Sequence, residues 1–249
     1  MARKVLVVTG GSTGIGAAVA RMAAKEGYDV ALSYRSSAGP AEAVVADIRA
    51  AGRKAFAMRA DSASAADTAA FFAAVDRELG RVTALVNNAG ITGPACRIEA
   101  LDPAALDEVL AINVRGCFLA LAEAIRRMAT DLGGAGGVVV NVSSRASEIG
   151  GAGEWVHYAA SKGAVDTLTV GASRELAPRG IRVNAVNPGL IDTEIHAKAG
   201  MPDRTERFKP MIPMGRAGSA EEVADVILWL LSEKSSYVTG ALVPIGGGR

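Results

Sequence analysis

A tyrosine and a lysine one helical turn apart have the residue types and the spacing of an acid/base pair. Tyr158 and Lys162 lie four positions apart at the start of a segment with helical spacing, so both side chains would project from one helical face. A free tyrosine has a pKa of about 10, and a nearby ammonium favours the phenolate and lowers that pKa. The pair is a candidate general acid/base, although the same spacing also occurs on ordinary helix surfaces.

A glycine-rich turn follows the first apolar strand and leads directly into a helical segment. Residues 9–16 read TGGSTGIG, so the glycines are Gly10, Gly14 and Gly16, with Gly11 extra, and the spacing is not GxGxxG. Glycines let the backbone approach a pyrophosphate, and the N-terminus of the following helix offers free N–H groups. The turn predicts a dinucleotide site, although a plain strand-to-helix turn has a similar composition.

The end of the second predicted strand indicates which dinucleotide would bind. Residues 33–37 read SYRSS and contain no carboxylate that would bind the adenosine ribose hydroxyls. Arg35 can instead bind a 2′-phosphate through two charge-assisted hydrogen bonds, and Ser36 can add a hydroxyl. We therefore expect NADP(H) rather than NAD(H), the alternative being a solvated arginine at the start of a loop.

Short apolar runs alternate with helical segments along the whole chain. Continuous apolar strands imply burial on both faces, and intervening helices imply right-handed crossovers and a parallel sheet. The sequence predicts an α/β fold in which a single Rossmann-like domain spans residues 1–249, with a doubly wound parallel sheet of about seven strands and helices on both faces. Strands are expected at 5–8, 30–32, 55–58, 85–86, 138–140, 181–186 and 241–245, and helices at 14–27, 41–51, 65–79, 103–131, 156–177 and 220–231.

The segment 190–218 differs from the rest of the chain because it contains three prolines and shows little periodicity. A long irregular segment inside a compact domain is typically a lid or a binding loop, so we predict a substrate lid here. Glu154, Trp155, His157 and His196 flank the acid/base pair or lie in this segment. They would either shape a substrate pocket or simply pack.

The bulk composition narrows the classes of function. The formal net charge is +1, which disfavours nucleic acid and anionic membranes as partners. No apolar stretch approaches the roughly 18 residues that span a bilayer. The two cysteines, Cys96 and Cys117, form no CxxC pair, and we expect them to be reduced in a cytoplasmic chain. There is no GxSxG nucleophile motif, and no cluster has the spacing of metal ligands.

Several motifs occur in a fixed order, each at a strand end or on a predicted helix. They are TGGSTGIG at 9–16, NNAG at 87–90, Asn113, NVSS at 141–144, YAASK at 158–162, NPG at 187–189 and YVTG at 237–240. This ordered set, which extends over essentially the whole chain, resembles the short-chain dehydrogenase/reductase family, in particular its 3-oxoacyl-carrier-protein reductase and glucose dehydrogenase branches. The resemblance implies hydride transfer between nicotinamide and a carbonyl or secondary alcohol.

The resemblance also implies roles for four catalytic residues. Tyr158 resembles the family's proton donor, and Lys162 the residue that lowers the tyrosine pKa and holds the nicotinamide ribose. Ser144 resembles the hydroxyl that binds the substrate oxygen. Asn113 resembles the residue that holds a water in a proton relay to Lys162.

The cofactor contacts follow from the same resemblance. Residues 88–90 resemble the wall beside the adenosine ribose, Asp61 the carboxylate that meets the adenine amino group, and residues 188–193 the stretch that fixes the carboxamide. The predicted cofactor-binding residues are Gly10, Ser12, Thr13, Gly14, Ile15, Gly16, Tyr34, Arg35, Ser36, Asp61, Ser62, Asn88, Ala89, Gly90, Tyr158, Lys162, Pro188, Gly189, Ile191 and Thr193.

Some of these residues also have simpler structural interpretations. Asp61 would serve equally as a cap for the helix that begins near Ser64. Asn113 would serve as a buried residue at a helix kink, bonded to backbone, and Thr193 as a hydroxyl in a turn.

Two adjacent serines compete for the catalytic position. Ser144 precedes Tyr158 by 14 positions, one more than the family resemblance leads us to expect, and the glycine-rich loop 150–155 can absorb an insertion. We favour Ser144 and keep Ser143 as the alternative.

Two questions about function stay open. A protein that senses NADP without turnover is the rival to an enzyme, although it would have no need of an acid/base group. Among enzymes, a 3-oxoacyl thioester reductase and a sugar or polyol dehydrogenase both fit the motifs. The family resemblance further implies a homotetramer that packs through the helices near Pro103 and Val156 and through the last strand.

Overall fold

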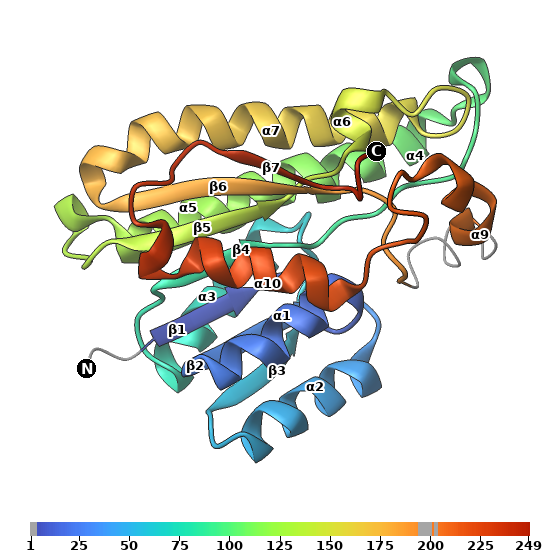
Figure 1. Cartoon of the computed structure of the whole chain (residues 1–249). Helices are drawn as coiled ribbons and strands as arrows, with labels where there is room; N and C mark the ends of the chain where they lie inside the picture. Colours follow the sequence, from blue (N-terminus) through green and yellow to red (C-terminus); the bar gives the residue numbers. More distant parts are fainter. Residues whose placement is uncertain (1–3, 194–200, 202–203) are drawn as a thin grey trace.

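Seven parallel strands form one sheet in the order β3-β2-β1-β4-β5-β6-β7 (Figure 1). The structure is a computed structural model, and it describes residues 4–193, 201 and 204–249. The strand order reverses between β1 and β4, which creates a crevice at the carboxyl ends of these strands. The strands are β1 (Lys4–Val8), β2 (Tyr28–Tyr34), β3 (Ala55–Arg59), β4 (Ala84–Asn87), β5 (Gly137–Val142), β6 (Ile181–Pro188) and β7 (Leu242–Ile245).

Helices cover both faces of the sheet, as the sequence predicts. One face carries α1 (Gly14–Lys25), α2 (Ala38–Ala50) and α10 (Ala220–Leu231), and the other carries α3 (Ala65–Glu78), α5 (Gly116–Met128) and α7 (Val156–Leu176). Successive residues of a strand face opposite layers: Leu6 and Val8 pack with the first group of helices, whereas Val5 and Val7 pack with the second. The prediction of a doubly wound, Rossmann-like sheet is confirmed.

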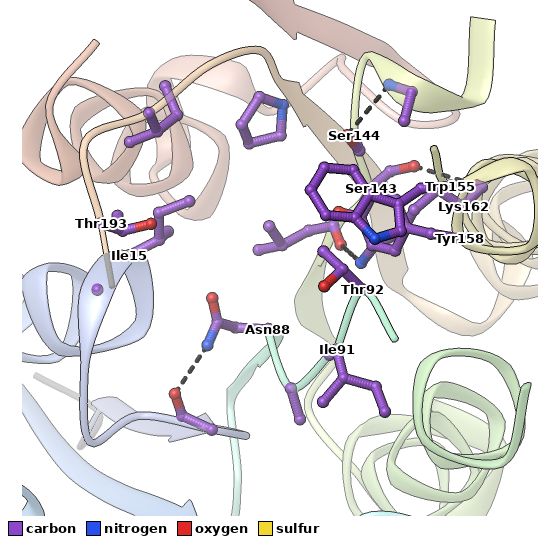
Figure 2. A pocket seen from close by; sticks show the side chains of 18 of the residues that line it. Ile15, Asn88, Ile91, Thr92, Ser143, Ser144, Trp155, Tyr158, Lys162 and Thr193 are labelled. Carbon is purple, nitrogen blue, oxygen red and sulfur yellow. Dashed lines mark hydrogen bonds between the residues drawn. The ribbon is translucent and has the colours of Figure 1, made fainter. Parts of the chain in front are cut away.

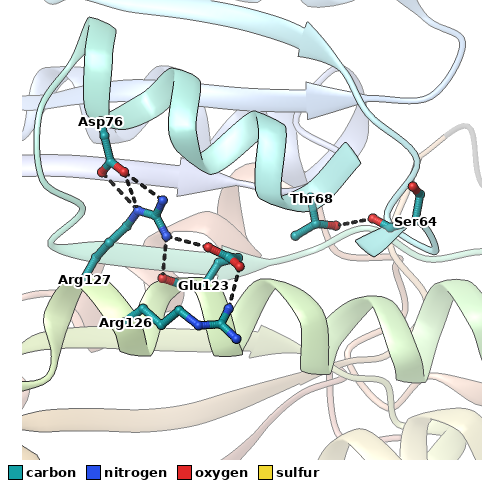
Figure 3. A network of polar contacts seen from close by, with 6 residues as sticks. All are labelled: Ser64, Thr68, Asp76, Glu123, Arg126 and Arg127. Carbon is teal, nitrogen blue, oxygen red and sulfur yellow. Dashed lines mark hydrogen bonds and ion pairs between the residues drawn. The ribbon is translucent and has the colours of Figure 1, made fainter. Parts of the chain in front are cut away.

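An arginine on α5 ties that helix to α3 on the outer surface (Figure 3). Arg127 Nε donates to both carboxylate oxygens of Asp76 on α3, at 3.0 and 2.8 Å, and its Nη1 lies 2.6 Å from Glu123 on its own helix. Glu123 also pairs with Arg126. A shared network of this kind fixes the relative position of two helices better than isolated surface ion pairs do.

The helix predicted at 103–131 is interrupted and ends earlier than expected. It consists of α4 (Pro103–Leu110), a π-helical turn over Ala111–Arg115 and α5, which ends at Met128. A π-helical turn inserts one extra residue per turn, and such turns are frequent at functional sites. The inserted turn carries Asn113, which is buried.

Hydrogen bonds join the two ends of the predicted lid region. Asp192 N donates to Gly218 O at 2.9 Å, and Gly218 N donates to Leu190 O at 3.0 Å, so both ends of the segment 190–218 are joined. The segment contains the short helix α9 (Arg204–Phe208), whereas residues 194–200 and 202–203, including His196, lie outside the described residues. A second short helix, α6 (Ala146–Ile149), was not predicted.

Candidate active site

A large pocket opens at the carboxyl ends of the strands. Its volume is about 720 Å³, and its wall runs from the glycine turn to the ends of β2–β6 and on to the lid region. In Figure 2, Ile15 and Thr193 lie on one side of the pocket, and Ser144, Tyr158 and Lys162 lie on the other. One cavity therefore joins the predicted dinucleotide turn to the predicted acid/base pair.

The glycine turn offers donors that the protein itself leaves unused. Gly10 and Gly14 have φ angles of 63° and 54°, in the left-handed region that favours glycine. Thr13 precedes α1 without forming a side-chain cap, and no acidic residue lies in the first turn of that helix. The first N–H groups of α1 and the positive end of its dipole therefore suit a pyrophosphate.

The end of β4 is hydrogen-bonded to the glycine turn. Thr9 Oγ1 accepts hydrogen bonds from the backbone N–H groups of Asn88 and Ala89 at 3.0 and 3.1 Å. Asn88 Nδ2 donates to Thr9 O at 3.1 Å and to Gly10 O at 2.8 Å. Gly16 packs behind this contact and does not line the pocket, so its role is to let α1 approach the turn.

Most of the other predicted cofactor residues also line the pocket, but Ser36 does not. Ser36 is exposed on the loop after β2, whereas Arg35 is in the wall and pairs with Glu108 of α4 at 2.8 Å. Arg59, which the sequence analysis missed, donates from Nε to Arg35 O. Residues that line the pocket as predicted are Gly10, Ser12, Thr13, Gly14, Ile15, Tyr34, Arg35, Asp61, Ser62, Asn88, Ala89, Gly90, Tyr158, Lys162, Pro188, Gly189, Ile191 and Thr193.

Asp61 combines a pocket position with a local structural role. Its Oδ1 accepts from Ala63 N at 2.9 Å, whereas the cap of α3 is Ser64, whose hydroxyl accepts from Asp67 N at 3.1 Å. The alternative in which Asp61 itself caps α3 is therefore wrong. Its carboxylate stays at the pocket wall.

Ser144 and Tyr158 lie on the same side of the pocket (Figure 2), whereas Ser143 is used elsewhere. The hydrogen bond with Ser144 favours the phenolate and lowers the pKa of Tyr158. Ser143 is buried, and its Oγ donates to the backbone oxygen of Lys162 at 3.1 Å. The geometry favours Ser144 as the hydroxyl next to the reacting oxygen.

The pKa of Tyr158 is shifted in the direction opposite to the one expected from the sequence. Burial raises this pKa above 10, and the hydrogen bond with Ser144 only partly offsets that effect. Lys162 Nζ lies 5.7 Å from the centroid of the tyrosine ring, and it donates instead to Val142 O at 2.7 Å. The expectation that Lys162 lowers the tyrosine pKa is wrong for the protein's own groups, because burial raises that pKa and is its largest cause.

Lys162 itself has a strongly shifted pKa. Burial lowers it from 10.5 to about 8, while the charges of Cys117 and Asp166 act in the opposite direction. The ammonium is therefore present at neutral pH and is lost within an accessible pH range.

This shift predicts the pH dependence of carbonyl reduction. A depressed lysine pKa means that the cation persists below about pH 8 and loses its proton as the pH rises through that value. We expect kcat/KM for reduction to be level near neutral pH and to fall by about tenfold per pH unit above the transition. The measurement is a profile of initial rates from pH 6 to 10. A level profile throughout would contradict an essential Lys162 ammonium.

Asn113 is held by backbone, as its structural interpretation predicts. Its Oδ1 accepts from Ile91 N at 2.9 Å, and its Nδ2 donates to Ile91 O at 2.8 Å and to Ser161 Oγ at 2.9 Å. Both amide hydrogens are therefore engaged. A cavity of about 10 Å³, close to the size of one water, is lined by Asn113, Lys162 and Cys117 among others. The role of Asn113 in a proton relay stays a prediction.

A group of arginines in the pocket wall was not predicted from the sequence. Arg145, Arg204, Arg207 and Arg249 line the pocket beside Trp155. Arg204 and Arg207 lie on the short helix α9, whereas Arg145 and Arg249 come from distant parts of the chain. No sequence motif predicts that the four would meet. His157, by contrast, is buried with Nε2 3.0 Å from Thr92 O, and it has a packing role.

The described residues offer neither a metal-binding cluster nor a membrane-spanning helix. In the described part of the chain, no three His, Cys, Asp or Glu side chains are grouped so that they would hold a metal ion. No helix within these same residues combines the length and the apolar character needed to cross a membrane.

Comparison with known proteins identifies the family. Residues 10–249 match a family model described as enoyl-(acyl carrier protein) reductase. The uncharacterized oxidoreductase YgfF of Escherichia coli (strain K12) is 51% identical over 245 residues, 98% of this chain and 99% of that protein. The 3-oxoacyl-(acyl-carrier-protein) reductase FabG of Staphylococcus aureus is 37% identical over 245 residues, 98% of this chain and 97% of that protein.

A solved structure agrees with these matches. A short-chain dehydrogenase from Burkholderia cenocepacia, determined in complex with NADP, superposes with a TM-score of 0.90 at 35% identity and covers 98% of this chain and 97% of that one. The fold, the ordered motifs and the sequence matches agree. The chain is thus an oxidoreductase that belongs to the short-chain dehydrogenase/reductase family.

Proposed function

We propose that the protein is an NADP(H)-dependent oxidoreductase that interconverts a carbonyl and a secondary alcohol, with Tyr158 as its acid/base. The observation that carries this proposal is that Ser144, Tyr158 and Lys162 line one pocket with the uncapped N-terminus of α1. A hydroxyl and a phenol side by side can both donate to one carbonyl oxygen. A pocket that also accepts a pyrophosphate places a dinucleotide next to them.

The residues of the chain would divide the work. Ser144 and Tyr158 donate hydrogen bonds to the carbonyl oxygen and polarise it. The raised pKa of Tyr158 keeps the phenol protonated at neutral pH, so it can give its proton to the oxygen during reduction. The Lys162 ammonium stabilises the phenolate that results. The nicotinamide, when bound, supplies the hydride.

One assay distinguishes an NADP sensor from an enzyme and one class of substrate from another. A protein that senses NADP would bind NADPH without consuming it. Among enzymes, the resemblance to a reductase named for 3-oxoacyl thioesters supports that substrate over sugars or polyols. The test is a panel of acyl thioesters, quinones, simple ketones, sugars and alcohols, followed by NADPH absorbance. If nothing in the panel is turned over, the enzyme proposal fails.

The choice of NADP(H) rests on Arg35, and the NADP complex of the Burkholderia relative supports it. The guanidinium is half-exposed and already pairs with Glu108, so its contact with a phosphate would be partly screened. We expect Arg35→Ala to weaken NADPH binding by about tenfold, with little change for NADH. Dissociation constants for both cofactors provide the check. A preference for NAD that survives the substitution would overturn the assignment.

The choice between the two serines is tested by a matched pair of variants. We expect Ser144→Ala to lower kcat by about 10²-fold or more, because a donor to the reacting oxygen is lost. Ser143→Ala loses only a hydrogen bond to the Lys162 backbone, so a smaller fall is expected together with a lower melting temperature. If turnover is abolished by the Ser143 change alone, the assignment of Ser144 is wrong.

The remaining family properties are also proposals for this chain. We expect a cytoplasmic homotetramer formed by one-domain subunits, with residues 190–218 as the substrate lid. Large apolar side chains are exposed on the expected contact elements, among them Leu110 of α4, Phe118 of α5 and Leu242 of β7. Burial of such side chains between subunits supports assembly.

A further inference from the structure

One part of the pocket wall is strongly cationic, and the proposed chemistry does not use it. Arg204, Arg207 and Arg249 line the same cavity as Ser144 and Tyr158. The Arg204 guanidinium lies 4.2 Å from the ring centroid of Trp155 and 4.5 Å from that of Phe208. These aromatic rings hold the guanidinium groups at the pocket wall.

The carboxylates nearby do not balance these charges. Glu154 is 2.5 Å from Arg204 and 3.4 Å from Arg207, so one carboxylate serves two cations. Within the described residues, no ion pair joins the Arg249 guanidinium to a carboxylate. Burial and the positive charge of Arg204 both lower the pKa of Arg249, and the negative charge of Glu154 only partly offsets them. A partly buried cation that makes no direct ion pair is stabilised when a ligand supplies the anion.

Hydrogen bonds and a tight turn fix the position of the Arg249 backbone. Arg145 Nε donates to the backbone oxygen of Arg249 at 2.9 Å, and Arg249 N donates to Gly246 O at 3.1 Å. A Cβ atom on Gly246 would lie only 2.7 Å from the Arg249 backbone oxygen, so this turn needs glycine. The Arg249 guanidinium lies 5.1 Å from the ring centroid of Phe208. Its position is therefore set before any ligand binds.

We infer that the substrate carries an oxyanion group, either a carboxylate or a phosphate, which binds Arg249 while its carbonyl meets Ser144 and Tyr158. This inference rests on the proposed function, because it names the substrate class of the same pocket. The planar guanidinium matches both kinds of oxyanion through paired hydrogen bonds. Arg204 and Arg207 add positive potential around the bound group, and Glu154 keeps them in place.

The first experiment compares anionic and neutral forms of the same ketone. One pair of probes is 4-oxopentanoate and its methyl ester, and the other is hydroxyacetone phosphate and hydroxyacetone. We expect kcat/KM to be at least about tenfold higher for the anion in one pair, which also shows which oxyanion is preferred. Arg249→Gln should remove this ratio by lowering the value for the anion only, and Arg249→Lys should restore part of it. Arg77→Gln, which makes the same change on the exposed surface of α3, should leave the ratio unchanged.

A second readout does not depend on turnover. Calorimetric titration of the NADP⁺-loaded protein, which cannot reduce a ketone, with 4-oxopentanoate or hydroxyacetone phosphate should give binding that Arg249→Gln weakens by about tenfold and Arg77→Gln does not. If all four probes are inert in the assay, the proposed function loses support, while anion binding that depends on Arg249 still upholds the inference. If neutral ketones are reduced as well as the anionic forms and Arg249→Gln changes neither turnover nor binding, the inference is overturned while the enzyme proposal stands.

Discussion

Replacement of Tyr158 by phenylalanine is expected to lower kcat by about 10²–10⁴-fold while NADPH binds as before. The substitution removes only the phenolic hydroxyl, so the shape of the pocket wall is kept. The proton for the reduced oxygen then has no donor, and Ser144 loses its hydrogen-bond partner. A loss confined to kcat, without a change in the dissociation constant of NADPH, is the signature of a group that acts in the transition state.

Single-turnover rates and a fluorescence titration with NADPH provide the two measurements for this variant. Tyr237→Phe is a suitable control because it makes the same change at a fully exposed tyrosine. Turnover by the Tyr158 variant within a few-fold of the parent would refute the acid/base assignment. A parallel loss of NADPH affinity would instead indicate that the Tyr158 hydroxyl contributes to cofactor binding rather than to proton transfer alone.

Alanine at position 16 is the second substitution with a large expected effect. A Cβ atom on Gly16 would lie 2.5 Å from Asn88 Nδ2 and 2.6 Å from Gly10 O. Because Asn88 and Gly10 are themselves hydrogen-bonded at 2.8 Å, the glycine turn must shift to make room. We expect a loss of about 1–3 kcal/mol in the free energy of unfolding and a fall of at least tenfold in NADPH affinity.

The same change on α7 provides the matched control. Gly171 has no atom within 4 Å of the position where a Cβ would be placed, so alanine should leave NADPH affinity unchanged there. The free energy of unfolding should rise by up to about 1 kcal/mol, since alanine favours a helix over glycine. Thermal unfolding and calorimetric titration measure both quantities. Unaltered NADPH affinity in Gly16→Ala would show that this contact does not shape the dinucleotide site.

The strands of the sheet could be predicted from the sequence because a strand that is buried on both faces consists of a continuous run of apolar residues. The strand cores expected at 5–8, 138–140 and 181–186 all lie inside observed strands. Helix α10 begins and ends where predicted, at 220 and 231, and a capping box between Ser219 and Glu222 fixes its start. These elements depend on local patterns, which a single sequence contains.

The features that escaped prediction depend on contacts between distant residues. The π-helical turn carries Asn113, whose amide group bonds to the distant Ile91, and the periodicity of the sequence does not indicate such a partner. The raised pKa of Tyr158 reflects burial by the folded pocket, whereas the spacing to Lys162 pointed to a lowered one. The pocket arginines lie between positions 145 and 249, so only the folded chain brings them together.

Because β1 pairs with β4, the centre of the sheet cannot form during synthesis until β4 has left the ribosome. Val7 lies opposite Leu85, and the intervening residues form β2, β3 and three helical crossovers. At about 5–20 residues per second, β1 leaves the exit tunnel several seconds before β4 can reach it. During that interval one apolar edge at the future centre of the sheet is open to other chains. Slow or stalled synthesis before residue 87 would therefore favour aggregation, and chaperones that cover this edge would raise the yield of folded protein.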